Sequence, residues 1–405
     1  MKKAIVLLLA LALIGGAVFA QDAAYTLTGE ASLTWGYDLN SENHGFTNAA
    51  TASLEFPLVA ADSATAGEEA ITGYIAIEDF ELGVSGTDDE FALDGSTGSV
   101  TAKILFPSAL YLQIASAPDF EINNAKSFAP WVADEFDDDN GLVAPDLSPN
   151  GGFSFGMDGD FSFAVKVASS NAHDASDDEQ ANEYMVGMDF GYKLGEIANI
   201  SGSLLYGNLG ADANDFGFGA KVTSTPIEAL DLAVGFDLDM AMATATTTGF
   251  DAMFTADYAL ADLVSFGAGA YYGKADASAD ASRLDAKARM GLLAVENLTF
   301  EAGVDLWDLL ADPANNPMLV LIGGKASYKA MLSDATYIKP YAEGGYELND
   351  EVAALSVGLE AVLFPMVTFT VDYTAGELAT DDVTGGTNMG DDDKGVFTFV
   401  TTIAY

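Results

Sequence analysis

Apolar and polar residues alternate along much of this chain. In the segment LDLAVGFDLDM, residues 230–240, large apolar side chains occupy every second position, with aspartate and small residues between them. Successive side chains of an extended strand point to opposite faces, so this period of two predicts a strand with one apolar and one acidic face. Such a strand fits a soluble sandwich, whose apolar face meets a second sheet. It fits equally a membrane barrel, whose apolar face meets lipid.

The same alternation recurs in 14 candidate strands after about residue 150 and in four or five before it. Each is about ten residues long, the length that a tilted strand needs to cross a bilayer. The connections alternate as well: the one around Pro226 is short, whereas those that begin at Ser169 and Ala379 are long and acidic. Short turns at one end and long loops at the other are typical of outer-membrane barrels.

The alternation fails between Ala117 and Gly152, a segment that holds four of the 11 prolines. Proline removes a backbone donor and fixes φ, so this composition argues against strands. The segment is predicted to be a long loop, a plug inside a barrel, or the seam between two regions.

Residues 1–20 have the three parts of a secretory signal peptide. Lys2 and Lys3 precede an apolar run from Ala4 to Leu13, and a small-residue site ends at Ala20. This pattern predicts cleavage after Ala20. No later window is apolar for long enough to form a membrane-spanning helix. The absence of cysteine excludes disulfides, thiolate metal sites and a lipid-modified cysteine.

The chain is strongly acidic, with 62 acids, 15 lysines and arginines, and a formal net charge of −47. Nucleic acids and anionic lipid surfaces are therefore not expected as partners. The hydrophobic content of 50% and the aromatic content of 11% exceed those of a disordered acidic tail. The composition thus favours a large folded β protein.

Three features favour the membrane barrel over the sandwich. The last candidate strand, VFTFVTTIAY, ends in an aromatic residue that is in phase with its apolar face. Tyrosines such as Tyr184 and Tyr192 stand near strand ends, where interfacial aromatic girdles belong. Small residues such as Ala268 and Ala270 occupy apolar faces, which lipid tolerates better than a close-packed core does. The predicted fold is all-β, a transmembrane antiparallel β-barrel of about 16 to 20 strands, with 18 as the best even number.

Several segments resemble the major outer sheath protein and Tpr family of treponemal spirochaetes. They are residues 32–60, FAPW at 128–131, KPYAEGGYEL at 339–348 and GLEAVLFPMVTFTVDYTAGEL at 358–378. The resemblance covers most of the mature chain in two blocks. It implies an N-terminal region, 21–150, that is either barrel or periplasmic, and a C-terminal barrel region, 151–405. It also implies an outer-membrane porin, often trimeric, that is a surface antigen and adhesin.

Cations are scarce, and most of those left after signal cleavage fall on polar strand faces together with many acids. If these faces line a lumen, their charges line the pore. Arg283, Asp285, Lys287 and Arg289 alternate along one strand. They either create a transverse field at a constriction or, more simply, form ion pairs that satisfy enclosed charges. The residues predicted to line the pore are Arg283, Asp285, Lys287, Arg289, Asp231, Asp237, Asp239, Lys166, Lys193, Lys221, Lys325 and Lys329.

Catalytic and metal motifs fail in detail. The acidic segment DEFDDDNGL has Phe136 where a calcium loop needs an oxygen ligand. The segment GAGAYYGKA has Ala268 where a phosphate-binding loop needs glycine, and Ala275 where it needs a hydroxyl. The two histidines are not in a zinc-ligand spacing. We therefore expect no catalytic residues, no metal and no cofactor.

The expected function is that of an outer-membrane porin, a water-filled channel that prefers cations and passes small hydrophilic solutes by passive diffusion. Its expected partners are outer-membrane lipid, these solutes and two further copies in a homotrimer, and its expected location is the cell outer membrane. The alternative is a surface adhesin or antigen. In that case the 117–152 segment plugs the barrel, and acidic loops bind host extracellular matrix.

Overall fold

The computed structural model describes residues 26–57, 71–86, 91–96, 99–115, 120, 122, 124–125, 151–169, 184–208, 214–242, 246–261, 263–274, 282–310, 318–348, 352–376 and 394–404. The signal peptide predicted for residues 1–20 lies outside them. So do the acidic segment DEFDDDNGL and the terminal Tyr405.

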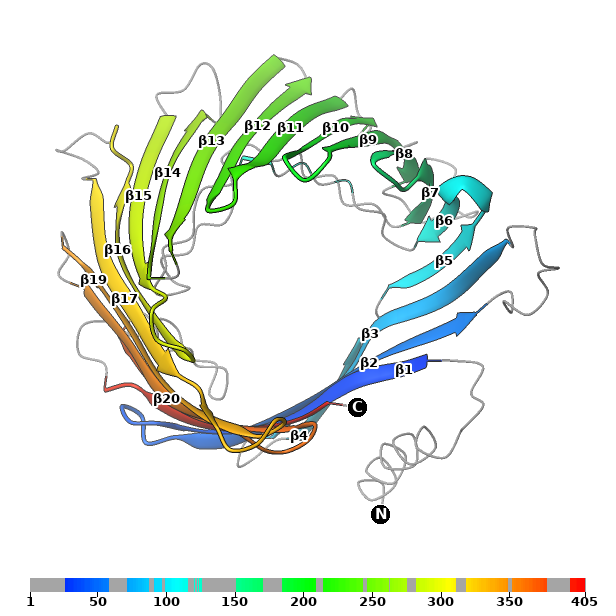
Figure 1. Ribbon diagram of the computed structural model, residues 1–405. Helices are drawn as coiled ribbons and strands as arrows, with labels where there is room; N and C mark the ends of the chain where they lie inside the picture. The colour runs from blue at the N-terminus through cyan, green and yellow to red at the C-terminus, as the bar shows by residue number, and fades with distance from the viewer. Residues whose placement is uncertain are drawn as a thin grey trace.

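All described strands belong to one antiparallel sheet that closes on itself, because the last strand pairs with the first (Figure 1). The first seven strands are β1 (Thr26–Asp38), β2 (His44–Pro57), β3 (Thr72–Gly86), β4 (Phe91–Ser96), β5 (Val100–Leu105), β6 (Leu110–Ala115) and β7 (Gly151–Met157). The next eight are β8 (Phe161–Ser169), β9 (Tyr184–Leu194), β10 (Ala198–Asn208), β11 (Asn214–Ile227), β12 (Leu230–Met242), β13 (Thr246–Leu260), β14 (Val264–Lys274) and β15 (Ser282–Leu292). The remaining strands are β16 (Leu298–Trp307), β17 (Leu319–Tyr328), β18 (Ala330–Met331), β19 (Tyr337–Glu347), β20 (Val352–Phe364), β21 (Val367–Gly376) and β22 (Val396–Ala404).

The barrel has 20 strand positions, formed by these 22 segments. β4 and β5 pair with successive parts of β3 and so occupy one position. The two-residue β18 likewise continues β17 along β19. The all-β antiparallel prediction is confirmed, but the best count of 18 was wrong. One missed strand is β7, whose seven residues directly follow the proline-containing segment and offer only a short alternating run.

The pairing places β1 to β6 in the same closed sheet as the strands after residue 150. β6 pairs with β7 across the long connection between them, and β22 pairs with β1 at the other junction. One short 3-10 helix, η2 (Pro107–Ala109), turns the chain from β5 into β6. Within the described residues, no helix is long and apolar enough to cross a membrane.

The two ends of the barrel differ in their connections. At one end, the short-turn end, lie the residues that begin β1 and end β22, and turns such as 158–160 and 228–229. Every connection there spans at most five residues except the one after β2. The opposite, long-loop end holds the connections after β6, 116–150, and after β21, 377–395.

The two faces of the sheet are inverted relative to a soluble protein. On β12 the side chain of Val234 is 51% exposed, whereas that of Asp237 is 1% exposed. The cyan pieces of the connection after β6 lie inside the ring (Figure 1), and they contact Asp237, so the face that carries Asp237 is the inner face. Residues directly opposite in neighbouring strands share a face. The register therefore identifies the inner-face residues of the other strands from those of β12. Acids lie inside and bulky apolar side chains lie outside.

Candidate pore lining and constriction

Eleven of the twelve residues predicted to line the pore lie on the inner face of a strand, by alternation and register. The twelfth, Lys329, lies between β17 and β18, and its ammonium group stands 3.9 Å from the centre of the Tyr337 ring. The structure does not bring the twelve together in one cluster. Most of them lie on two neighbouring parts of the wall, β11 to β13 and β15 to β20, whereas Lys166 and Lys193 lie on β8 and β9.

One part of the wall, which we call the acidic wall, is formed by β11 to β13. Two pairs of aspartates stand directly opposite each other there, Asp231 with Asp257 and Asp237 with Asp251. Like charges directly opposite in a sheet are destabilising, so each pair needs compensation. The inner-face acids of the acidic wall are Asp215, Asp231, Asp237, Asp239, Asp251 and Asp257.

Asp237 is compensated by backbone and side-chain N–H groups of the connection after β6. The backbone N–H of Asn124 donates to Asp237 Oδ2 at 2.7 Å, and the N–H of Ala125 donates to the same oxygen at 2.6 Å. The Asn124 side-chain amide donates to Oδ1 at 3.0 Å. Hydrogen bonds from N–H groups to a carboxylate are shorter and stronger than neutral ones. Asp237 therefore holds this part of the connection against the inner wall, and we call its described residues, 120, 122, 124 and 125, the anchored segment.

Glycines make room for the anchored segment. A Cβ atom at Gly235 would lie 1.9 Å from the Asn124 carbonyl oxygen, closer than any real contact allows. A Cβ at Gly219 would lie 2.4 Å from the Ile122 side chain. These two positions on β11 and β12 must therefore lack a side chain for the backbone of the segment to reach Asp237.

Apolar contacts complete the attachment of the anchored segment. Phe120 and Ile122 are buried in a cluster with Ala168, Met185 and Leu205, which come from β8, β9 and β10. Burying two large apolar side chains contributes roughly 1.5 to 3 kcal/mol each. The segment is thus fixed to five consecutive strands by both polar and apolar contacts, and it occupies part of the lumen beside them.

Asp215 and Asp239 stand near the long-loop end of the acidic wall. One carboxylate oxygen of each, Oδ1, is buried and accepts no hydrogen bond within the described part of the chain. A buried carboxylate oxygen without a donor is costly and attracts positive charge. This part of the wall therefore favours the approach of a positive charge, either a cation or a proton.

The neighbouring part of the wall, β15 to β20, carries both signs of charge. At its long-loop end, Arg283 Nε lies 2.8 Å from Asp285 Oδ2, and the guanidinium lies 5.0 Å from the Trp307 ring. The backbone N–H of Asp308 donates to Asp285 Oδ1 at 2.8 Å. Burial raises the pKa of Asp308, and the negative charge of Asp285 raises it further. Asp285 thus joins β15 to the beginning of the connection after β16.

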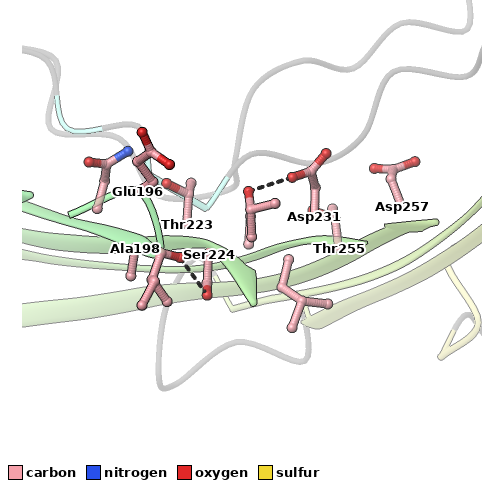
Figure 2. A pocket seen from close by; sticks show the side chains of 12 residues that line it. Glu196, Ala198, Thr223, Ser224, Asp231, Thr255 and Asp257 are labelled. Atoms are coloured by element: carbon pink, nitrogen blue, oxygen red, sulfur yellow. Dashed lines mark hydrogen bonds between the residues drawn. The ribbon is translucent and has the colours of Figure 1, made fainter. Parts of the chain in front are cut away.

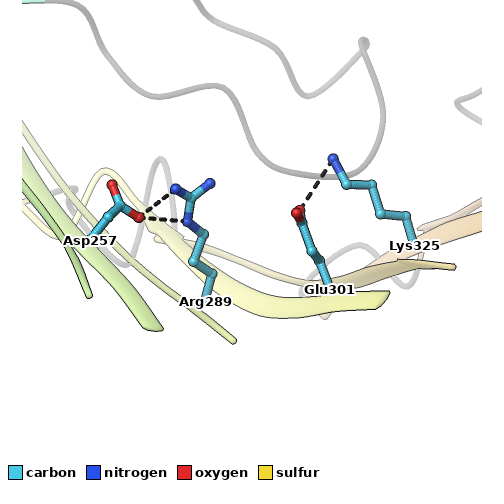
Figure 3. A network of polar contacts seen from close by, with 4 residues as sticks. All are labelled: Asp257, Arg289, Glu301 and Lys325. Carbon is cyan, nitrogen blue, oxygen red and sulfur yellow. Dashed lines mark hydrogen bonds and ion pairs between the residues drawn. The ribbon is translucent and has the colours of Figure 1, made fainter. Parts of the chain in front are cut away.

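Two ion pairs further along this wall point into the lumen, as Figure 3 shows. Arg289 forms an ion pair with Asp257 across β14, and Lys325 Nζ lies 3.2 Å from Glu301 Oε2. Lys287 stands directly opposite Asp305 in the register of β15 and β16. Each of the three cations on β15, Arg283, Lys287 and Arg289, therefore has an acid as its partner or directly opposite it.

The remaining predicted residues are placed as follows. Lys166 Nζ lies 2.5 Å from Asp189 Oδ2 and 6.0 Å from the centre of the Phe120 ring. Lys193 is exposed on β9, near the short-turn end. Lys221 lies on the inner face of β11, opposite Gly235. Lys166 consequently borders the anchored segment, whereas Lys193 is well separated from it along the barrel axis.

Sequence reasoning missed the partners of Asp237. Asn124 and Ala125 are more than 110 residues from Asp237 in the chain, and nothing in their local sequence indicates a contact with β12. The only available signal was the failure of alternation between residues 117 and 152, which suggested a plug as one of three alternatives. Among the described residues, no group of three or more histidines, cysteines, aspartates or glutamates is arranged to hold a metal ion.

No protein-family model and no curated protein matches this chain. Solved porin structures match it over most of its length. A mutant of Rh. blastica porin is 12% identical and has a TM-score of 0.38, over 94% of this chain and 100% of that one. Pseudomonas aeruginosa OccK5 (OpdH) is 10% identical, with a TM-score of 0.43 over 94% and 97%. Acinetobacter baumannii OccAB4 is also 10% identical, with a TM-score of 0.42 over 96% and 99%.

Proposed function

We propose that this protein is an outer-membrane channel through which small hydrophilic solutes diffuse. One observation carries the proposal: the barrel is closed, its inner face is charged, and its outer face exposes large apolar side chains. Val234, Phe254 and Met290 are between 45% and 51% exposed, whereas Asp237, Asp251 and Asp285 are at most 1% exposed. A soluble protein buries the first set and solvates the second. Lipid outside and water inside explain this distribution.

The direction of the barrel follows from its two ends. In barrels of this kind the short turns and both chain ends face the periplasm, and the longer loops face the outside. The short-turn end is therefore assigned to the periplasm, and the connections 116–150 and 377–395 begin at the external end. The same argument supports the outer membrane as the location. Protease added to intact cells should cleave the long-loop end. If these loops resist the protease on intact cells and are cleaved only after lysis, the orientation is wrong.

The anchored segment lies inside the barrel and therefore narrows the channel. It lies inside the ring and is held to the wall by three N–H donors and an apolar cluster. An inserted segment reduces the open cross-section that is available to any solute that passes. This observation also supports the second candidate function, a surface adhesin whose barrel is closed by this segment.

Single-channel recording in planar bilayers tests both functions. Refolded wild-type protein is compared with a variant in which a short Gly-Ser linker replaces residues 117–150, so that β6 and β7 stay intact. We expect conductance steps from the wild type and larger steps from the deletion. Steps from the deletion alone would identify a plug and favour the adhesin. No steps from either protein, with the barrel folded by circular dichroism, would refute the channel.

Membership in the treponemal major outer sheath protein and Tpr family remains our proposal, supported by the sequence segments quoted above and compatible with a barrel that begins at Thr26. Trimer formation and binding of host matrix are likewise proposals that rest on this resemblance. Cross-linking of the detergent-solubilised protein, followed by denaturing electrophoresis, measures the oligomeric state directly.

A further inference from the structure

A pocket of about 320 Å³ lies in the inner wall at the short-turn end, between the strands β10 and β13. Figure 2 shows the carboxylates of Glu196, Asp231 and Asp257 standing on one side of the sheet, with Thr223 and Thr255 between them. Glu196 comes from the turn after β9, and the two aspartates come from β12 and β13. The volume is at the lower end of the range found for small-molecule sites.

The charge of this pocket is only partly compensated. Asp257 forms an ion pair with Arg289, and the Thr225 hydroxyl donates to Asp231 Oδ1 at 2.6 Å. Within the described residues, Glu196 and Asp231 have no cationic partner. Asp231 and Asp257 stand directly opposite in the register, which costs free energy unless a positive charge approaches both. The pocket therefore has a net negative charge, and a bound cation would reduce the repulsion between its carboxylates.

The chemistry of the lining selects the kind of cation. The carboxylates are not arranged to ligate one metal ion, since no such group exists among the described residues. They stand on three different elements around a cavity, so separate charged groups of one molecule can reach them. Thr223, Thr255 and the Asn199 amide supply hydrogen-bond acceptors and donors between them. Primary ammonium groups offer three donors each and suit carboxylates and hydroxyls together.

We propose that this pocket binds small organic cations with one or two primary ammonium groups, such as short alkyl diamines or amino sugars. The proposal rests on the channel function, because the pocket opens from the inner wall of the barrel. Bound there, such a cation sits at the short-turn end of the conduction path. It consequently delays its own passage and obstructs that of other ions.

The test uses 1,4-diaminobutane as the probe and the refolded full chain. In planar bilayers, micromolar to millimolar diamine is added on the side of the short-turn end, and the reduction of single-channel current is measured. The double variant Glu196→Gln, Asp231→Asn is compared with Glu30→Gln, which removes one inner-face acid on β1 at the same end but outside the pocket. Loss of one partly solvated charge contact corresponds to about a tenfold change in affinity, so we expect the double variant to weaken block at least ~10-fold. Glu30→Gln should shift it by less than about twofold.

Calorimetric titration of diamine into the detergent-solubilised barrel separates this proposal from the channel itself. Saturable binding that the double variant loses, without any conductance, would uphold the pocket and refute the channel. Conductance without diamine block or binding would refute the pocket alone. Equal loss of block in Glu30→Gln and in the double variant would also overturn the proposal, because it would show a diffuse field rather than a site.

Discussion

At the scale of single residues, two aspartates on one face of β12 have different roles. Asp231 is exposed in the inner wall and accepts a hydrogen bond from a threonine hydroxyl, so its charge is available to solutes. Asp237 is buried, and three N–H donors of the anchored segment saturate its carboxylate. The same residue type thus contributes to ion attraction at one position and to the shape of the lumen at the other.

Replacement of Asp237 by alanine should release the anchored segment. Three N–H groups lose their acceptor, at a cost of about 1 to 3 kcal/mol each if the segment stays in place, so the segment is expected to detach at least in part. We predict a higher single-channel conductance for Asp237→Ala, together with faster proteolysis of the connection after β6. Asp231→Ala removes the same charge from the same strand face and serves as the control. Equal conductance of the two variants would show that Asp237 does not position a constriction.

At the scale of elements, β15 carries two arginines in contrasting environments. The Arg283 side chain is 14% exposed and pairs with a fully buried Asp285, whereas the Arg289 and Asp257 side chains are both about 40% exposed. Breaking a buried pair leaves an uncompensated charge, whereas breaking an exposed pair changes little because water and salt screen it. One strand therefore holds a buried ion pair that stabilises the fold near the long-loop end. Its second ion pair, near the short-turn end, is exposed and contributes little to stability.

Urea unfolding of detergent-solubilised variants should separate these two arginines. For Arg283→Ala we expect a loss of about 3 to 5 kcal/mol in the free energy of unfolding, since Asp285 remains buried without its cation. Arg289→Ala should cost less than about 1 kcal/mol. The double variant Arg283→Ala, Asp285→Ala checks the cause, and it should recover part of the loss. A larger effect from Arg289→Ala than from Arg283→Ala would contradict the assignment.

At the scale of the whole molecule, charge and shape act together. The acidic wall presents six inner-face aspartates on three strands, and the neighbouring wall pairs most of its cations with acids. A cation that is paired with an acid contributes little to the electrostatic potential at a distance. The acids are in excess, so the potential in the lumen is negative. A negative lumen raises the local concentration of cations and lowers that of anions.

The reversal potential across a potassium chloride gradient should therefore show preference for cations. Because the Debye length falls from about 10 Å at 0.1 M to about 3 Å at 1 M salt, the preference should weaken as the mean concentration rises. The variant Asp231→Asn, Asp239→Asn removes two aspartates of the acidic wall and should reduce the preference at low salt. An anion-selective sign in the wild type would refute the proposal.

Much of the element structure could be predicted from the sequence, because alternation is a local property of a strand. The two faces of β12, β15 and β22 follow directly from their residues, and so does the position of Asp231 and Arg283 on the polar face. The short β7 and the divided position of β4 and β5 could not be predicted well. Their limits depend on pairing with β6 and β3 rather than on their own composition.

The sequence by itself determined that the chain forms antiparallel strands with one apolar and one charged face, since side chains in a strand alternate with a period of two. Only the tertiary structure decided that 20 strand positions close the ring, because closure depends on how β22 meets β1. It also decided what Asp237 contacts. Its hydrogen-bond donors are N–H groups of Asn124 and Ala125, which the chain brings back from more than 110 residues away.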